Sequence, residues 1–184
     1  MTLWWLLTWR TYGSWLPGDP RGFRTWRRRE YVPPPREQAE SGEPIYNPGD
    51  YTERYAAARE RLTAPAVCLT LADRRKACSA LVAEIGKLQI VPAILAVAES
   101  HVHFISQFGE LRIRRVAGRL KAAATIAIKH QNSTEGPVWG TGSHMKSLYA
   151  EDDFVSAFRY VEQHEGEGAV VHKWDSNIDW KFDR

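Results

Sequence analysis

The sequence predicts an α+β domain in which an antiparallel β-sheet is backed by helices. Three observations favour this class: apolar or alternating runs typical of strands, amphipathic segments with helical spacing, and turn residues between them. The expected order is strand, long insertion, helix, hairpin, helix, strand and helix, followed by a short strand. This order is compatible with a ferredoxin-like arrangement. With 184 residues, the chain is long enough to form one domain with its own core.

Strands are expected where apolar runs are bounded by turn residues. They span residues 3–9, 90–98, 101–108, 137–149 and 169–174. The first is almost continuously apolar and aromatic, which is typical of a buried strand. The second and third are separated only by Glu99 and Ser100, so we expect a hairpin.

Three helices are expected, from Thr70 to about Lys87, from Glu110 to His130, and from Asp152 or Asp153 to about Glu165. Thr70 and Asp73 approximate a capping box at the first helix start. Asp152 or Asp153 would cap the third helix, and Gly166 would end it. The second helix has an apolar stripe, and its opposite side is basic.

Residues 24–66 differ in composition from the rest of the chain. An arginine run, Arg27 to Arg29, precedes the prolines at 33–35, and aliphatic residues are few. We expect an inserted loop or partly ordered flap within a single domain that spans residues 1–184.

Composition limits the classes of function. A net charge of +3 and a pI near 8.9 permit a polyanionic partner without requiring one. Cys68 and Cys78 have neither the number nor the spacing of a disulfide framework or a zinc knuckle. The apolar opening, residues 1–7, is too short to cross a bilayer. A cytoplasmic location, with no membrane partner, is therefore expected.

The candidate site begins with His101-Val102-His103. Residues two apart on a strand point to the same face, so both imidazoles would lie side by side and form half of a metal site. On the third helix, His164 lies about 40° and Gln163 about 60° from Tyr160 in projection, one turn along. Strand and helix together would offer a tyrosine hydroxyl beside three metal ligands.

These residues resemble the HUH single-tyrosine transposases, in particular the REP-associated tyrosine transposase-like proteins. The family's histidine–hydrophobic–histidine strand is matched by residues 101–103, and its tyrosine helix by residues 158–164. Residues 11–22 look like a signature of one bacterial branch, and residues 118–121 are similar to the family's second helix. The resemblance covers most of the chain but not the insertion.

The chain departs from the family pattern at two places. Ala98-Glu99-Ser100 stands where family members usually have Met-Pro-Asn before the first histidine. His164 stands where many members have a glutamine or asparagine as third ligand. Gln163 is therefore the alternative third ligand, and Glu165 is a further candidate oxygen ligand.

The resemblance implies an HUH nuclease core and a DNA transposase. Tyr160 would attack a phosphate of single-stranded DNA near a hairpin and form a covalent 5′-phosphotyrosine intermediate, as in DNA transposition and recombination. His101, His103 and His164 would bind Mg²⁺ or Mn²⁺. A homodimer is compatible with the family. The candidates for DNA phosphate contacts are Arg112, Arg115, Arg119 and Lys121.

Three alternatives belong to other classes. A two-histidine phosphoesterase needs two His-x-Thr or His-x-Ser motifs, which His144 and His172 do not supply. A barrel metallohydrolase needs about 250 residues, so this chain of 184 residues is too short for one. A catalytically silent protein of the same fold that binds hairpin DNA or RNA stays open.

Overall fold

The computed structural model describes residues 3–24, 31–34, 48–130 and 135–174. The chain divides into two compact units. One consists of residues 1–11 and 67–184, and the other of residues 12–66. The second unit contains the expected insertion but begins before it, at Tyr12.

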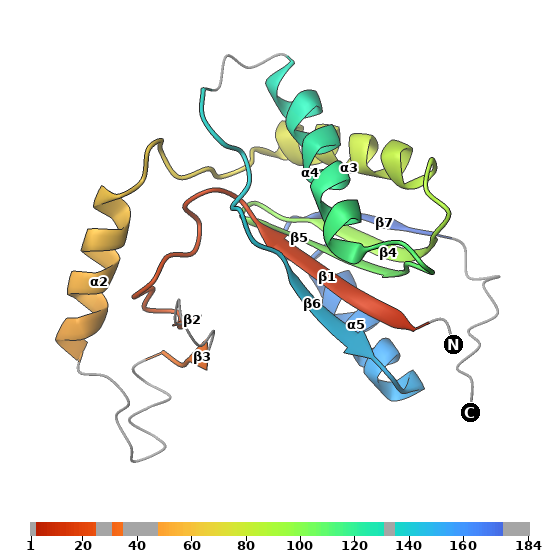
Figure 1. The fold of residues 1–184 in the computed structure, drawn as a ribbon, viewed down its shortest axis with the longest axis horizontal. Coiled ribbons are helices and arrows are strands. Elements are labelled where there is room, and N and C mark those ends of the chain that lie inside the picture. Colours follow the sequence, from red (N-terminus) through yellow and green to blue (C-terminus); the bar gives the residue numbers. More distant parts are fainter. Residues whose placement is uncertain (1–2, 25–30, 35–47, 131–134, 175–184) are drawn as a thin grey trace. The chain divides into compact units, whose positions relative to one another are not determined.

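The larger unit is built on a five-stranded antiparallel sheet (Figure 1). Its strands are β1 (Trp4–Arg10), β4 (Val91–Val97), β5 (His101–Gln107), β6 (His144–Leu148) and β7 (Val170–Lys173). The order across the sheet is β6-β1-β5-β4-β7. A strand was expected over residues 137–149, but only His144–Leu148 forms one. Before it, Trp139 makes an isolated bridge with Thr11.

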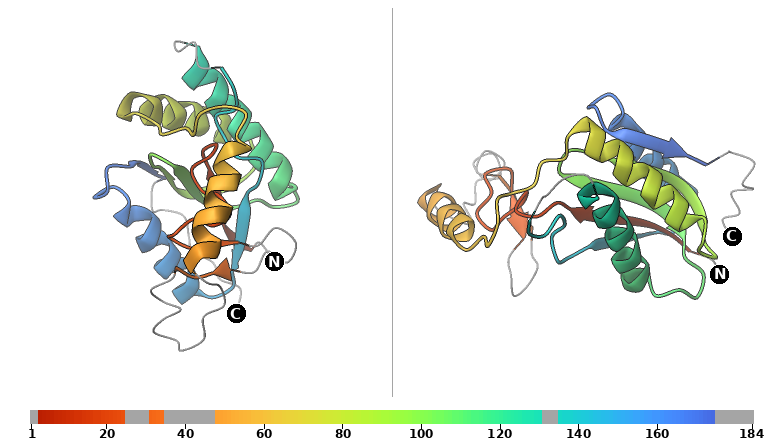
Figure 2. Two further views of the ribbon diagram at one scale, coloured as in Figure 1. Left: turned by 90° about the vertical axis from the view of Figure 1, so that its left-hand side faces the viewer. Right: turned by 90° about the horizontal axis from the view of Figure 1, so that it is seen from above.

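Helices α3 (Leu71–Ile85) and α4 (Ile113–Lys129) cover one face of this sheet (Figure 2). With them, β1, β4, β5 and β6 follow the βαββαβ order of a ferredoxin-like fold. The α+β class with helices on an antiparallel sheet is therefore confirmed. The expected capping box is present, since the Thr70 hydroxyl accepts the Asp73 amide and the Asp73 carboxylate accepts the Thr70 amide.

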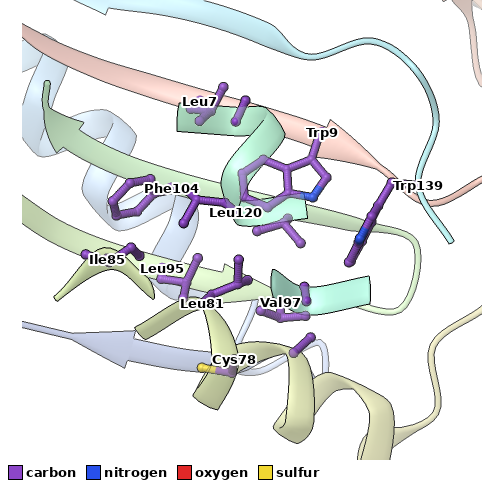
Figure 3. Close-up of a cluster of buried hydrophobic side chains, with 14 of the residues drawn as sticks. Leu7, Trp9, Cys78, Leu81, Ile85, Leu95, Val97, Phe104, Leu120 and Trp139 are labelled. Carbon is purple, nitrogen blue, oxygen red and sulfur yellow. The ribbon is translucent and has the colours of Figure 1, made fainter. Parts of the chain in front are cut away.

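The core between the sheet and these two helices is almost entirely shielded from solvent (Figure 3). Alternate strand residues point into it, including Leu7, Trp9, Leu95 and Phe104. Burial of this apolar surface is the main source of stability for the unit. Val102 also belongs to this core, so its neighbours His101 and His103 face the other side of the sheet.

Helix α5 (Glu151–Gln163) covers part of that other face. Phe154, Ala157 and Val161 pack against strand residues such as Ile94 and Ile105. The sheet therefore separates two cores. One core lies under α3 and α4, and a smaller one lies under α5.

The ends of α5 differ from the expectation. The residue before the helix is Ala150, and neither Asp152 nor Asp153 occupies the capping position. Asp153 acts from the third helical position instead, because its carboxylate accepts the Ala150 amide at 3.4 Å. The helix stops before Gly166, and the glycine with positive φ in the following turn is Gly168.

The smaller unit contains β2 (Phe23–Arg24), β3 (Tyr31–Val32) and α2 (Pro48–Glu60). A helix in this region was not expected. Its alanines have high helix propensity but leave little amphipathic pattern to detect. A small core of Phe23, Val32 and Tyr51 holds the unit together.

The arginine run, Arg27 to Arg29, lies outside the described residues. Among those described, no helix is both long and apolar enough to span a membrane.

Candidate metal centre

Three imidazoles meet on the sheet face that α5 covers. Strand β5 supplies His101 and His103, and His164 is the residue directly after α5. Their ring centroids lie 4.7 Å (101–103), 4.9 Å (103–164) and 5.1 Å (101–164) apart. One ring nitrogen from each lies within 4.8 Å of the others. Within the described part of the chain, this is the only such group of histidine, cysteine or carboxylate side chains.

Each of these rings has a hydrogen-bond partner at Nδ1. His103 Nδ1 lies 2.8 Å from the Thr8 hydroxyl, and His101 Nδ1 lies 3.2 Å from the Ser100 hydroxyl. His164 Nδ1 lies 2.8 Å from the Tyr160 carbonyl oxygen. A carbonyl only accepts, so neutral His164 carries its proton on Nδ1 and its lone pair on Nε2. Partners of this kind orient histidines that bind metals.

Tyr160 lies at the open side of the cluster. Its hydroxyl is 3.5 Å from His103 Nε2, and its ring centroid is 4.8 Å from that of His164. The residue is 48% exposed, whereas His103 and His164 are buried. Tyr160 is therefore the member of this group with the most contact with solvent.

Burial sets the protonation states at the site. It lowers the pKa of His101 to about 4 and that of His103 to about 3, and neighbouring imidazoles and Arg10 add to the effect. Both rings are therefore neutral at pH 7, so each has a lone pair for a metal. Burial raises the pKa of Tyr160, and Arg10 opposes that shift. The phenol is protonated at neutral pH and needs activation before it can attack.

The donor set fits a divalent metal ion. Neutral imidazoles suit borderline cations such as Zn²⁺, Ni²⁺ and Fe²⁺, while oxygen ligands suit Mg²⁺ and Mn²⁺. Nitrogen ligands at about 2.1 Å lie about 3 to 3.5 Å from one another around a metal. The most distant pair of ring nitrogens would therefore have to move closer by more than about 1 Å to hold one ion.

The other residues expected near the third ligand are placed differently. Gln163 is exposed, and so is Glu165, whereas His164 turns into the cluster. His164 points into the cluster because it directly follows α5, one turn beyond Tyr160 and on the same side of the helix.

The four basic residues expected to contact DNA lie on or at the start of α4, behind the other face of the sheet. Arg119 Nε donates to Glu84 on α3 at 3.0 Å. Lys121 Nζ donates to the carbonyl oxygens of Gly140 and Gly142 at 2.8 and 2.7 Å. These two cations therefore serve contacts within the protein. Arg112 and Arg115 are exposed at the start of the helix.

Sequence reasoning missed four polar residues on the face of the site. On β1, Thr8 pairs with His103 and Arg10 pairs with His101. On β6, His144 pairs with Thr8 and Lys146 pairs with Leu6, and both β6 residues are exposed. Directly paired strand residues share a face, so all four lie on the histidine side. The only signal in the sequence is the period of two, which does not reveal the register between strands.

Comparisons with known proteins show a distant structural likeness. No family model matches the sequence, and no curated protein matches it significantly. The structure is similar to a solved structure of a REP-associated tyrosine transposase bound to a REP hairpin. The TM-score is 0.48 and the sequence identity 8%, over 91% of this chain and 68% of that chain. Similarity at this level carries no conclusion about function, so the function rests on the site itself.

Proposed function

We propose that this chain is an HUH-type single-tyrosine transposase, a metal-dependent enzyme that cuts and rejoins single-stranded DNA near hairpins. One observation carries the proposal. The hydroxyl of Tyr160, a half-exposed residue, lies 3.5 Å from one of three clustered imidazoles whose Nδ1 atoms all have hydrogen-bond partners. A tyrosine hydroxyl beside a set of imidazole ligands is suited to attack on a phosphodiester.

The reaction is a transesterification. Tyr160 Oη forms a bond to phosphorus, the bond from phosphorus to the 3′-oxygen breaks, and that oxygen takes up a proton. A divalent cation held by His101, His103 and His164 would stabilise charge on the phosphate oxygens and favour loss of the phenol proton. The product is a 5′-phosphotyrosine and a free 3′-hydroxyl. Attack by a 3′-hydroxyl on the phosphotyrosine reverses the step without a nucleotide cofactor.

The DNA strand would cross the face of the sheet that carries the site. Arg10, His144 and Lys146 share that face with Tyr160, whereas α4 lies behind the opposite face. We therefore move the expected phosphate contacts from α4 to β1 and β6. Each phosphate contact to a single strand contributes a slope of about 0.7 in the logarithmic salt dependence of affinity.

The proposal is tested with a hairpin DNA that has labelled single-stranded flanks. The protein is incubated with this DNA and Mn²⁺ or Mg²⁺, and the products are separated under denaturing conditions. We expect a labelled protein–DNA adduct that disappears with a chelator and in Tyr160→Phe. Tyr149 is 75% exposed and lies outside the cluster, so Tyr149→Phe is the matched control and should form the adduct.

Two outcomes contradict the proposal. An adduct that persists in Tyr160→Phe would move the nucleophile to another residue. Tight hairpin binding without an adduct in the presence of either Mn²⁺ or Mg²⁺ would identify a catalytically silent binding protein instead.

A further inference from the structure

We propose that Thr8 is a positioning residue that holds His103 in the orientation and tautomer required for metal binding. The inference rests on the proposed function, because it concerns the same three imidazoles. It adds a residue of β1 that would act through His103.

The strand register brings Thr8 to His103. The two residues are direct partners in the antiparallel pair of β1 and β5, and their side chains share one face. Thr8 Oγ1 lies 2.8 Å from His103 Nδ1, which is a well-formed hydrogen bond. The contact joins residues 95 positions apart in the sequence. It therefore exists only when the sheet is correctly paired.

A threonine hydroxyl can donate or accept, and the proposal is that Thr8 accepts from His103, which sets the nitrogen that can bind a metal. When the threonine hydroxyl accepts from Nδ1–H, the lone pair of the neutral ring is on Nε2. His103 Nε2 is the atom that lies 3.5 Å from the Tyr160 hydroxyl. Thr8 thus directs the lone pair toward the side of the ring on which the tyrosine lies.

His103 depends on this contact more than the other two histidines depend on theirs. His164 is held by a carbonyl of its own helix, and His101 by the hydroxyl of the adjacent residue at 3.2 Å. These contacts are local, and the His101 contact is longer. Within the described part of the chain, the Thr8 hydroxyl is the one hydrogen-bond partner of buried His103 at Nδ1. Without this hydroxyl, the ring proton could move to Nε2, where it blocks metal binding.

The test compares wild type with Thr8→Ser and Thr8→Val. Serine keeps the hydroxyl, whereas valine keeps the branched shape and removes it. Metal-free protein is titrated with Co²⁺, followed by visible absorption, and with Mn²⁺, followed by calorimetry. We expect Thr8→Val to bind about 10- to 100-fold more weakly and Thr8→Ser to bind like wild type. Thr125→Val removes a threonine hydroxyl from α4 and should not change the affinity.

A second measurement needs no variant. Nitrogen NMR of the histidine rings in metal-free wild type at pH 7 reports the tautomer of His103, and we expect the proton on Nδ1. A proton on Nε2 would overturn the proposal, and so would Thr8→Val with wild-type or tighter affinity. If wild type binds neither metal, the proposed function fails as well. If wild type binds metal and Thr8→Val binds it equally, only the role of Thr8 fails.

Discussion

Acid should destabilise the metal-free protein, and replacement of His103 should remove a defined part of this effect. Burial lowers the pKa of His103 in the folded protein to about 3, and the His101 and His164 imidazoles act in the same direction. In the unfolded chain the imidazole returns to an ordinary pKa near 6.5. Between these values the unfolded chain binds a proton that the folded protein excludes. Stability is therefore present above pH 6.5 and is lost as the pH falls below it.

The magnitude follows from the linkage between protonation and folding. Each pH unit below 6.5 costs about 1.4 kcal/mol for one excluded proton. Between pH 7.5 and pH 5.0, His103 alone should lower the free energy of unfolding by about 2 kcal/mol. This figure requires only that its pKa in the folded state lies well below 5. His101, with a pKa lowered to about 4 by burial, should add a comparable loss.

Urea denaturation in the presence of a chelator measures this effect. The free energy of unfolding of wild type and His103→Gln is determined at pH 7.5 and pH 5.0. We expect the variant to lose about 2 kcal/mol less than wild type between these two pH values. Between pH 7.5 and 8.5 the difference between the two proteins should stay constant, because the imidazole is neutral in both states. An equal acid loss in both proteins would refute the buried, neutral state of His103.

Three further predictions concern helix α3, the core and the face proposed to bind DNA. Thr70→Ala should reduce the free energy of unfolding by about 1 kcal/mol, with Thr70→Ser close to wild type in the same denaturation assay, because the hydroxyl caps α3. Leu81→Ala should cost about 2 to 5 kcal/mol, since this side chain is fully buried, whereas Ile126→Ala at a 68% exposed position should change stability by less than about 0.5 kcal/mol. Lys146→Gln should weaken binding of single-stranded DNA and lower the salt slope by about 0.7, while Arg115→Gln on α4 should change neither in the same fluorescence titration. The reverse pattern would return the DNA to the α4 side.

Most elements of the larger unit could be predicted because each leaves a local pattern. The period of two places His101 and His103 on one face, and the helical period places His164 near Tyr160. The alternation that sends Val102 into the core also predicts which way the imidazoles point. The structure brings these side chains together as the sequence leads one to expect.

Contacts between distant segments could not be predicted in the same way. No local sequence pattern shows that Thr8 pairs with His103, because the register between strands depends on the whole sheet and its turns. The basic side of α4 was recognised, but the face of the sheet that α4 covers depends on the chain connections. The sequence also could not show that Arg119 and Lys121 make hydrogen bonds to other groups of the protein. Their predicted contact with DNA stays a prediction.

The central claim is that Tyr160 is the nucleophile of a metal-dependent reaction with DNA. The most direct measurement is mass spectrometry of peptides from protein incubated with a single-stranded hairpin substrate and Mn²⁺. We expect the peptide containing Tyr160 to gain the mass of the DNA fragment on the 3′ side of the cut, joined through its 5′-phosphate. The gain should be absent with a chelator and in His103→Ala. An unmodified Tyr160 peptide from DNA that has nevertheless been cut, or the same mass on another residue, would contradict the account.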